Sequence, residues 1–194
     1  MNPGDPIEQF SEWFDTAVAA GEPEPNAMCL ATATADGAPS ARMVLLKSVD
    51  RRGFVFFTNY RSRKAGELAG NARAALVFRW PAVHRQVRVT GTVTKVSAAE
   101  SDAYFATRDR GSQIGAWASA QSTVLSGREE LEAAVAEVSE RFAGEASLPR
   151  PRHWGGFRVR PVTVEFWEQR NDRLHDRLLF TRAGSRWRME RLSP

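Results

Sequence analysis

Between residues 28 and 96, short apolar runs alternate with turn signals, and this pattern limits the possible fold more than any other feature of the sequence. The runs predict strands at 28–35, 39–49, 54–58, 74–80 and 84–96. Asp36-Gly37 is a strong hairpin signal between the first two. The C-terminal part repeats the pattern, with strands expected at 156–159, 163–167, 173–181 and 187–192. Because hairpins join many of these strands, we expect an antiparallel β-barrel.

Helices are expected at the periphery of this barrel. Residues 7–20 carry apolar side chains at helical spacing, and Asp5 provides an N-cap before a proline. A short helix is expected at 62–69, and a helical insertion at about 97–143. The sequence therefore predicts a single domain over residues 1–194, mainly β with α additions.

The composition is that of an ordinary globular protein. The 27 Lys and Arg against 23 Asp and Glu give a net charge of +4, too small to indicate a nucleic-acid partner. No apolar run is long enough for a membrane span and no signal-peptide pattern opens the sequence, so a cytoplasmic protein without membrane attachment is expected. The three histidines are scattered and Cys29 is single, so we expect neither a metal site nor a disulfide.

Two basic pairs could bind an anion. Arg63 and Lys64 fall at a predicted helix start, where free backbone amides favour a phosphate, although a solvated basic turn would look the same. Arg42 and Lys47 belong to one predicted strand but are an odd number of residues apart. They would therefore point to opposite faces, unless a bulge intervenes or Lys47 lies beyond the strand end.

The helical insertion carries start signals and a further polar stripe. Ser-x-x-Glu at 97–100 and at 126–129 both match the capping box, which predicts helix starts at these sites. Three side chains suited to a phosphate follow the first box at intervals of four: Tyr104, Arg108 and Ser112. They would share a helix face if the helix were continuous, but Gly111 is a candidate break.

The segment 173–177 has an unusual density of charge. On a strand, Arg173, His175 and Arg177 would share one face and repel one another unless something anionic lay opposite. Asp176 would point to the other face. A solvated edge strand explains the pattern as well as a ligand site does.

Several segments together resemble the pyridoxamine (pyridoxine) 5′-phosphate oxidase family. The matching stretches are RMVLLK at 42–47, FFTNYRSRK at 56–64, RQVRV at 85–89, YFATR at 104–108, SQIGAWASAQS at 112–122, PRPRHWGGFRV at 149–159, EFW at 165–167 and RLHDR at 173–177. They follow the family's order over most of the chain. The resemblance implies an FMN-binding split β-barrel, antiparallel and Greek-key-like with peripheral helices, and a homodimer with the flavins at the subunit interface.

The resemblance also assigns roles to residues. It implies FMN contacts from Arg42, Met43, Val44, Leu45, Leu46, Lys47, Phe57, Thr58, Arg63, Lys64, Gln86, Gln121, Ser122, Trp167 and Arg177. It implies substrate contacts from Lys47, Tyr104, Arg108, Ser112, Arg173 and His175, the last two being the catalytic pair. The implied partners are a small phosphorylated pyridine substrate and molecular oxygen.

The implied reaction is oxidation of pyridoxamine or pyridoxine 5′-phosphate to pyridoxal 5′-phosphate, with release of hydrogen peroxide. The chain departs from the usual family pattern at Asp109 and at Glu168-Gln169, and few residues precede the first helix. These departures leave open a related FMN oxidase of phenazine biosynthesis acting on a tricyclic substrate. A non-catalytic flavin-binding protein is a further alternative.

Overall fold

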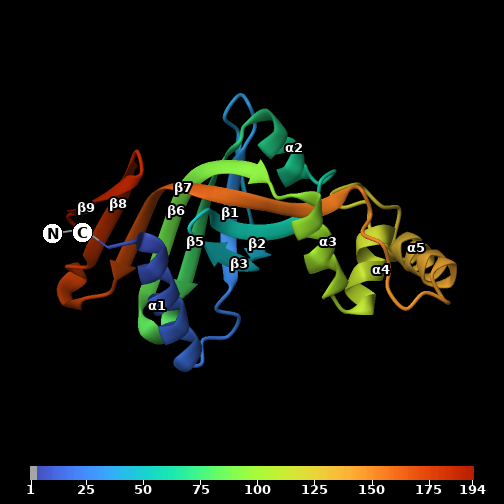
Figure 1. Ribbon diagram of the computed structural model, residues 1–194, viewed down its shortest axis with the longest axis horizontal. Coiled ribbons are helices and arrows are strands. Elements are labelled where there is room, and N and C mark those ends of the chain that lie inside the picture. Colours follow the sequence, from blue (N-terminus) through green and yellow to red (C-terminus); the bar gives the residue numbers. More distant parts are fainter. Residues whose placement is uncertain (1–3) are drawn as a thin grey trace.

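Nine antiparallel strands form one curled sheet over residues 4–194, the part of the chain that the computed structural model describes (Figure 1). The order is β2-β1-β5-β6-β7-β4-β3, with β8 paired to β7 and β9 paired to β8. The strands are β1 (Ala27–Ala33), β2 (Pro39–Leu45), β3 (Ser48–Asp50), β4 (Gly53–Asn59), β5 (Arg73–Trp80), β6 (Arg85–Lys95), β7 (Trp154–Glu168), β8 (Asp176–Ala183) and β9 (Arg186–Arg191).

Helices lie around the sheet, as the sequence predicts. They are α1 (Pro6–Ala19), α2 (Arg63–Gly70), α3 (Ala98–Ala106), α4 (Arg110–Ala118) and α5 (Arg128–Arg141). Asp5 caps α1 by accepting the Ile7 N–H at 2.9 Å, and Ser97 with Glu100 forms the expected capping box at α3. The mainly β class with peripheral helices is thus confirmed. Among residues 4–194, no helix has the length and apolar content to cross a bilayer.

The core lies inside the curl of the sheet and is closed by α1. Phe10 of α1 is fully buried, and its ring centroid lies 4.9 Å from the rings of Phe54 and Phe78. A second, smaller apolar cluster under α3, α4 and α5 includes Phe105, Phe142 and Trp154. Buried aromatic rings stabilise each cluster. The helices α3, α4 and α5 therefore pack on an apolar cluster that is separate from the main core.

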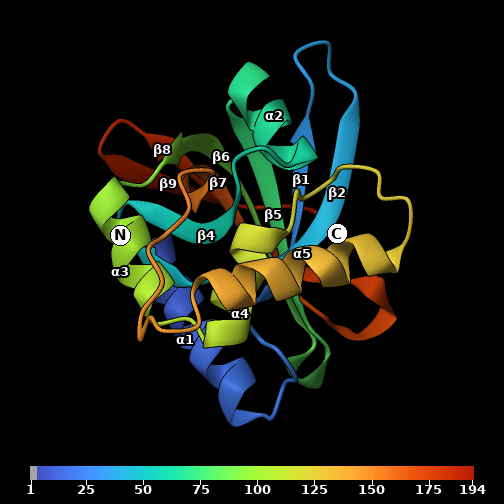
Figure 2. The ribbon, with the colours of Figure 1, turned by 90° about the vertical axis from the view of Figure 1, so that its right-hand side faces the viewer.

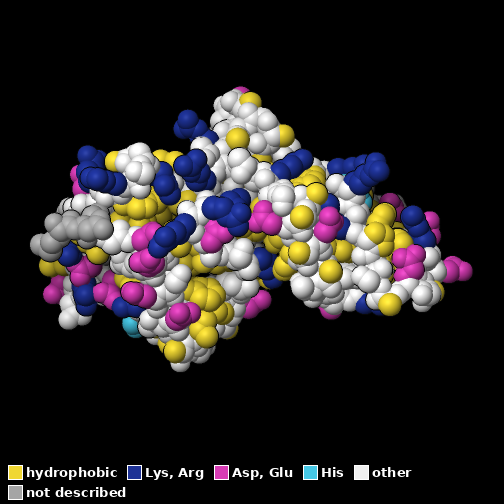
Figure 3. Space-filling model, viewed as in Figure 1, with side chains coloured by type: hydrophobic (Ala, Val, Ile, Leu, Met, Phe, Trp, Pro, Cys, Tyr) yellow, Lys and Arg dark blue, Asp and Glu magenta, His cyan; other side chains and the backbone are white. Residues whose placement is uncertain are grey.

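The two ends of the long axis are built differently. The hairpin β8–β9 and α1 occupy one end, and α3, α4 and α5 occupy the other (Figure 1). Seen from the helical end, α5 lies across the front of α4 (Figure 2). On the face shown in Figure 3, Lys and Arg side chains are interspersed with Asp and Glu.

The single strand predicted at 39–49 is wrong, because β2 ends at Leu45 and β3 begins at Ser48. The Leu46 N–H donates to Asn26 at the β1 side, and the next N–H, of Lys47, donates to Val55 of β4. The chain therefore leaves one strand partner for another at this point, and Lys47 lies beyond the end of β2.

The two strands predicted at 156–159 and 163–167 are one strand, β7. Thr90 of β6 pairs with Thr163 and Gly91 pairs with Pro161, so one residue of β7 is left over in a bulge. The bulge accommodates a proline that would end a regular strand. Gly91 is required here, since a Cβ on it would lie 2.2 Å from the Arg160 carbonyl oxygen.

Two further expectations about local structure are wrong. The second capping box does not form, because Gly127 is the N-cap of α5 and Ser126 donates to Glu130 instead. The strand predicted at 173–181 begins only at Asp176. Asp172 and Arg173 have φ values of 54° and 62°, so the backbone turns there, and Arg173, His175 and Arg177 do not share one strand face.

Candidate functional site

A cavity of about 840 Å³ lies where β2, β4 and α2 meet α3 and α4. It collects many of the side chains singled out from the sequence: Arg42, Met43, Val44, Leu45, Lys47, Phe57, Thr58, Lys64, Tyr104, Arg108, Ser112 and Gln121. Arg42 and Lys47 both line it because Lys47 follows the end of β2. Seven further residues line the cavity and were not predicted from the sequence: Asn59, Thr107, Asp109, Gly115, Ala116, Ser119 and Trp154.

One side of the cavity is a buried cation among neutral partners. Lys64, in the first turn of α2, is 8% exposed, and its Nζ donates to Thr58 at 3.2 Å and to Gln121 at 3.3 Å. Burial lowers the Lys64 pKa, and the charge of Arg42 lowers it further. A phosphate placed here would relieve this excess of positive charge.

The other side of the cavity is formed by the break between α3 and α4. The helix is not continuous from Tyr104 to Ser112, and the break precedes Gly111, because α3 ends at Ala106 and α4 begins at Arg110. Asp109 caps α4, and its Oδ1 accepts the Ser112 N–H at 2.8 Å. Tyr104, Arg108 and Ser112 nevertheless line the same cavity.

Three nearly parallel aromatic rings stand beside these polar groups. The Phe57 ring centroid is 4.1 Å from that of Tyr104 and 5.4 Å from that of Trp154. Trp154 was missed because it opens a strand, where an aromatic is ordinarily a core residue. The signal that could have found it is Gly155-Gly156 directly after it, a sign of close approach by other groups.

Arg108 is held against this wall with an unused donor. Its guanidinium carbon lies 4.6 Å from the Trp154 ring centroid. Its Nη1 is buried and has no hydrogen-bond partner among the described residues. Burial lowers the Arg108 pKa, although the guanidinium remains charged. A buried, unpartnered guanidinium nitrogen is a feature that an anionic ligand would satisfy.

The remaining predicted site residues are elsewhere. Leu46 is buried in the core, Arg63 pairs with Glu67 outside the cavity lining, and Ser122 is exposed in the loop after α4. The others form what we term the C-terminal cluster: Gln86, Trp167, Arg173, His175 and Arg177. Within it, Gln86 and Arg177 flank Trp167 across β6, β7 and β8.

The C-terminal cluster has its own fixed geometry. The His175 ring lies 4.5 Å from the Trp167 ring, and its Nδ1 accepts the Arg170 N–H at 3.2 Å. A neutral His175 therefore carries its proton on Nε2. Arg177 Nε donates to the buried Glu165 at 2.9 Å, while Arg173 is exposed.

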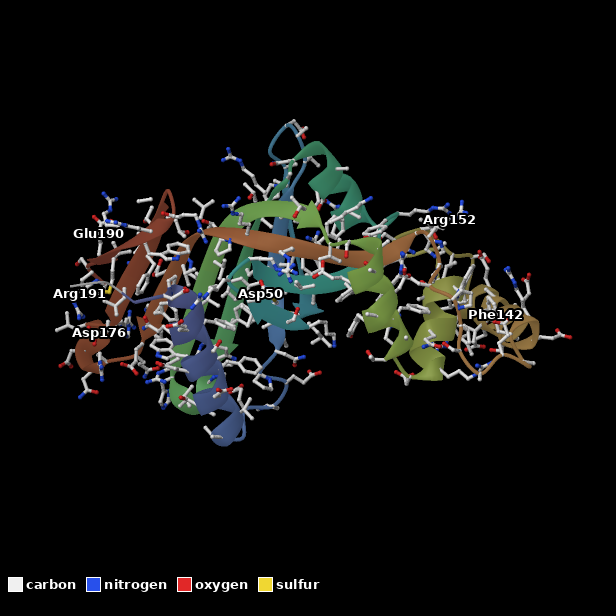
Figure 4. The ribbon with its side chains drawn as sticks, in the orientation of Figure 1. Asp50, Phe142, Arg152, Asp176, Glu190 and Arg191 are labelled. Atoms are coloured by element: carbon white, nitrogen blue, oxygen red, sulfur yellow. The ribbon has the colours of Figure 1, made fainter. Side chains whose placement is uncertain are left out.

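The cavity and the C-terminal cluster are far apart within one chain. Trp154, which lines the cavity, is the first residue of β7, and Trp167 of the cluster lies thirteen residues further along this extended strand. In Figure 4, Asp176, next to Arg177 of the cluster, lies at one end of the long axis, and Phe142 of the helical end lies at the other. A single chain therefore does not unite the predicted site residues.

Two family models match this chain. Residues 14–142 match the family model described as pyridoxamine 5′-phosphate oxidase, and residues 154–194 match the one described as pyridoxine 5′-phosphate oxidase C-terminal dimerisation region. The chain belongs to the pyridoxamine 5′-phosphate oxidase family. It is 60% identical over 190 residues to the pyridoxine/pyridoxamine 5′-phosphate oxidase of Rubrobacter xylanophilus, covering 98% of this chain and 87% of that protein.

Solved structures confirm the split-barrel fold. PhzG from Burkholderia lata, in complex with tetrahydrophenazine-1-carboxylic acid, aligns with a TM-score of 0.93 and 36% identity over 99% of this chain and 94% of that one. A pyridoxamine 5′-phosphate oxidase-related, FMN-binding protein from Nostoc punctiforme aligns with a TM-score of 0.74 and 17% identity, over 94% and 96% of the chains. Membership in this oxidase family identifies the chain as a flavin-dependent oxidoreductase.

Proposed function

We propose that this protein uses FMN to oxidise pyridoxamine 5′-phosphate or pyridoxine 5′-phosphate to pyridoxal 5′-phosphate, with oxygen as the acceptor. The similarity to oxidases of this name at 60% identity supports the reaction. The observation that carries it onto this chain's own residues is the buried Nη1 of Arg108 in the cavity wall, which has no hydrogen-bond partner within residues 4–194.

The residues present fit FMN. Lys64, buried among neutral acceptors with Arg42 near it, would hold the FMN phosphate with Thr58 and Gln121. The wall from Met43 to Lys47 and the Phe57 ring would border the rest of the cofactor. When bound, the flavin would accept a hydride from the substrate's 4′ carbon and pass the electrons to oxygen, which becomes hydrogen peroxide. Pyridoxine 5′-phosphate gives the aldehyde directly, whereas the imine from pyridoxamine 5′-phosphate takes up water and releases ammonia.

The substrate phosphate belongs on the α3–α4 side. Arg108 offers its free guanidinium nitrogen, Ser112 its hydroxyl, and Tyr104 its phenol. Lys47 Nζ lies 5.8 Å from the Tyr104 ring centroid and adds a cation between the two sides of the cavity. These contacts with the substrate phosphate would place the substrate's 4′ carbon in the orientation that the reaction needs.

The C-terminal cluster is proposed to complete the cavity of a partner subunit in a homodimer. Three observations support this arrangement: the dimerisation region covers every member of the cluster except Gln86, the cluster lies far from its own cavity, and Met43 of the edge strand β2 is 64% exposed beside the cavity. In the dimer, Arg173 would add a permanent positive charge near the pyridine ring. His175, protonated on Nε2, would donate a hydrogen bond to the substrate.

The experiment is a steady-state assay of purified, FMN-loaded protein with each B6 phosphate, measuring hydrogen peroxide and pyridoxal 5′-phosphate. We expect turnover of one or both substrates. In Arg108→Ala we expect a higher KM for the phosphorylated substrates, because a contact with the substrate phosphate is lost. FMN-loaded protein that is inert with both but oxidises tetrahydrophenazine-1-carboxylic acid would replace the proposal with the phenazine-type reaction. Protein that binds FMN and oxidises neither class would indicate a non-catalytic flavin-binding protein.

A further inference from the structure

Behind the cavity wall, a buried carboxylate gathers side chains from three elements. Glu67 of α2 is 6% exposed and does not itself line the cavity. Its Oε2 accepts from Thr32 of β1 at 2.5 Å, from Ser40 of β2 at 2.7 Å and from Arg42 of β2 at 3.2 Å. Its Oε1 accepts from Arg63 Nε at 2.9 Å. Both oxygens are therefore committed to fixed donors.

This network holds Glu67 ionised. The Thr32 hydroxyl, followed by Ser40, Arg63 and Arg42, lowers the Glu67 pKa to about 2 against the cost of desolvation. A buried carboxylate in this state is strongly committed to its cationic partners, because removing either side would leave a charge without compensation.

Glu67 also fixes how Arg42 can present itself. The Arg42 Nη1 is bound to Thr32 and the Leu30 carbonyl, and its Nη2 to Ser40 and Glu67. The planar guanidinium is thus clamped along its outer edge while Arg42 lines the cavity. Only the Nε–H of Arg42 is left without one of these partners. The four hydrogen bonds fix the orientation of the guanidinium, and with it the direction in which this donor and the positive charge face.

The charges around Glu67 match a phosphate dianion. Arg42 and Arg63 contact Glu67 directly, and Glu67 also raises the pKa of Lys64 against the effect of burial. Three cations and one carboxylate leave a net charge of +2 on this side of the cavity. A phosphate monoester carries a charge of roughly −1.5 to −2 at neutral pH.

We propose that Glu67 is a positioning residue for the phosphate of the flavin: it holds Arg42 in one orientation, so that FMN is bound in preference to unphosphorylated riboflavin. This inference rests on the proposed function. It assigns to Glu67 a role in cofactor selection without direct contact, through residues that do touch the cavity.

The test measures dissociation constants for FMN and for riboflavin by quenching of flavin fluorescence. In Glu67→Gln, the volume is retained but the charge is lost, and the amide nitrogen faces donors. We expect the FMN dissociation constant to rise by about 10- to 100-fold, the range seen when groups that orient a ligating side chain are removed. The preference for FMN over riboflavin should fall by a similar factor, while Glu67→Asp restores part of it.

Two matched variants separate positioning from stability. Ser40→Ala removes one hydroxyl that bridges Glu67 and Arg42 and leaves the fold's core intact, so it decides the matter if Glu67→Gln does not fold; its FMN dissociation constant should rise by about fivefold. Glu100→Gln breaks an ion pair with the buried Arg158 outside the cavity. It should lower the melting temperature without changing the FMN dissociation constant.

The outcomes distinguish the two proposals. Wild-type affinity for FMN in folded Glu67→Gln and in Ser40→Ala would overturn the inference alone, and so would tighter binding in Glu67→Gln, which would make Glu67 an electrostatic brake. Failure of the wild-type protein to bind FMN would overturn the proposed function, and the inference with it.

Discussion

The guanidinium carbon of Arg108 lies 4.6 Å from the centroid of the Trp154 ring, and its buried Nη1 has no hydrogen-bond partner in the part of the chain that the structure describes. Trp154 opens β7 and Arg108 follows α3, so the contact joins the sheet to the helical end of the molecule. An aromatic face holds a cation in place without using its hydrogen-bond donors. Arg108 is therefore oriented before any ligand arrives.

Arg108→Lys should raise KM for pyridoxine 5′-phosphate by about tenfold or more with a smaller effect on kcat, because lysine keeps the charge but loses the planar fork. Arg110→Lys is the matched control, since Arg110 donates to the Glu145 and Phe142 carbonyls away from the cavity. Steady-state kinetics of both variants check this. Equal KM values for the two variants would show that Arg108 does not bind the phosphate.

Asp109 places a negative charge next to this phosphate site. Its pKa is lowered, chiefly by the hydrogen bond from Ser112, so it is ionised at neutral pH. Asp109→Asn should keep the cap of α4 and lower KM for the phosphorylated substrate by about threefold, the effect of removing one partly screened like charge. Asp109→Ala should instead lower the melting temperature through loss of the cap. A KM that does not change in Asp109→Asn would mean that the carboxylate is too well solvated to matter.

The lowered pKa of the Glu67 carboxyl predicts how the free energy of unfolding changes at acid pH. Its pKa is about 2 in the folded protein against an ordinary value of 4.5. A pKa lowered by folding contributes stability that is fully present above the ordinary value and is lost as pH falls toward the folded value. The difference in unfolding free energy between the wild type and Glu67→Gln should therefore shrink between about pH 4.5 and pH 2. Urea unfolding at several pH values measures it, and a constant difference would contradict the network.

Gly91 tests the bulge in β7. A methyl group there would meet the Arg160 carbonyl oxygen at 2.2 Å, which is backbone and cannot move away easily. Gly91→Ala should destabilise the protein by about 3 kcal/mol, at the upper end for overpacking. Gly66→Ala is the control: this position of α2 is exposed, a methyl group there would meet no atom of the described residues within 4 Å, and the change should be neutral or stabilising. Thermal unfolding of the pair gives the comparison.

Local patterns in the sequence were sufficient for most strands and for the capped helices α1 and α3. They failed where the local structure depends on a strand partner that is distant in the sequence. Pro161 would end an isolated strand, but the register shift opposite Gly91 accommodates it. Leu46 and Lys47 look like the continuation of a strand, but they pair with Asn26 and Val55 instead.

The candidate site shows the same limit. Sequence spacing alone could not decide whether Tyr104, Arg108 and Ser112 meet, because that depends on the turn capped by Asp109. Trp154 is a large aromatic residue of the kind that ordinarily fills a core, and only the packing of α3 against β7 reveals its contact with Arg108. The expected alignment of Arg173, His175 and Arg177 was wrong because Arg173 itself lies in the turn and β8 begins only at Asp176.

The distance between the cavity and the C-terminal cluster has a genetic consequence. If the partner's cluster completes each cavity, an Arg108→Ala chain and an Arg173→Ala chain are defective in different halves of the site. A mixed dimer then holds one doubly damaged site and one intact site. Co-expression of two inactive alleles should restore activity at up to about a quarter of all sites, as follows from random pairing in a two-fold symmetric dimer. Each allele expressed alone would remain inactive.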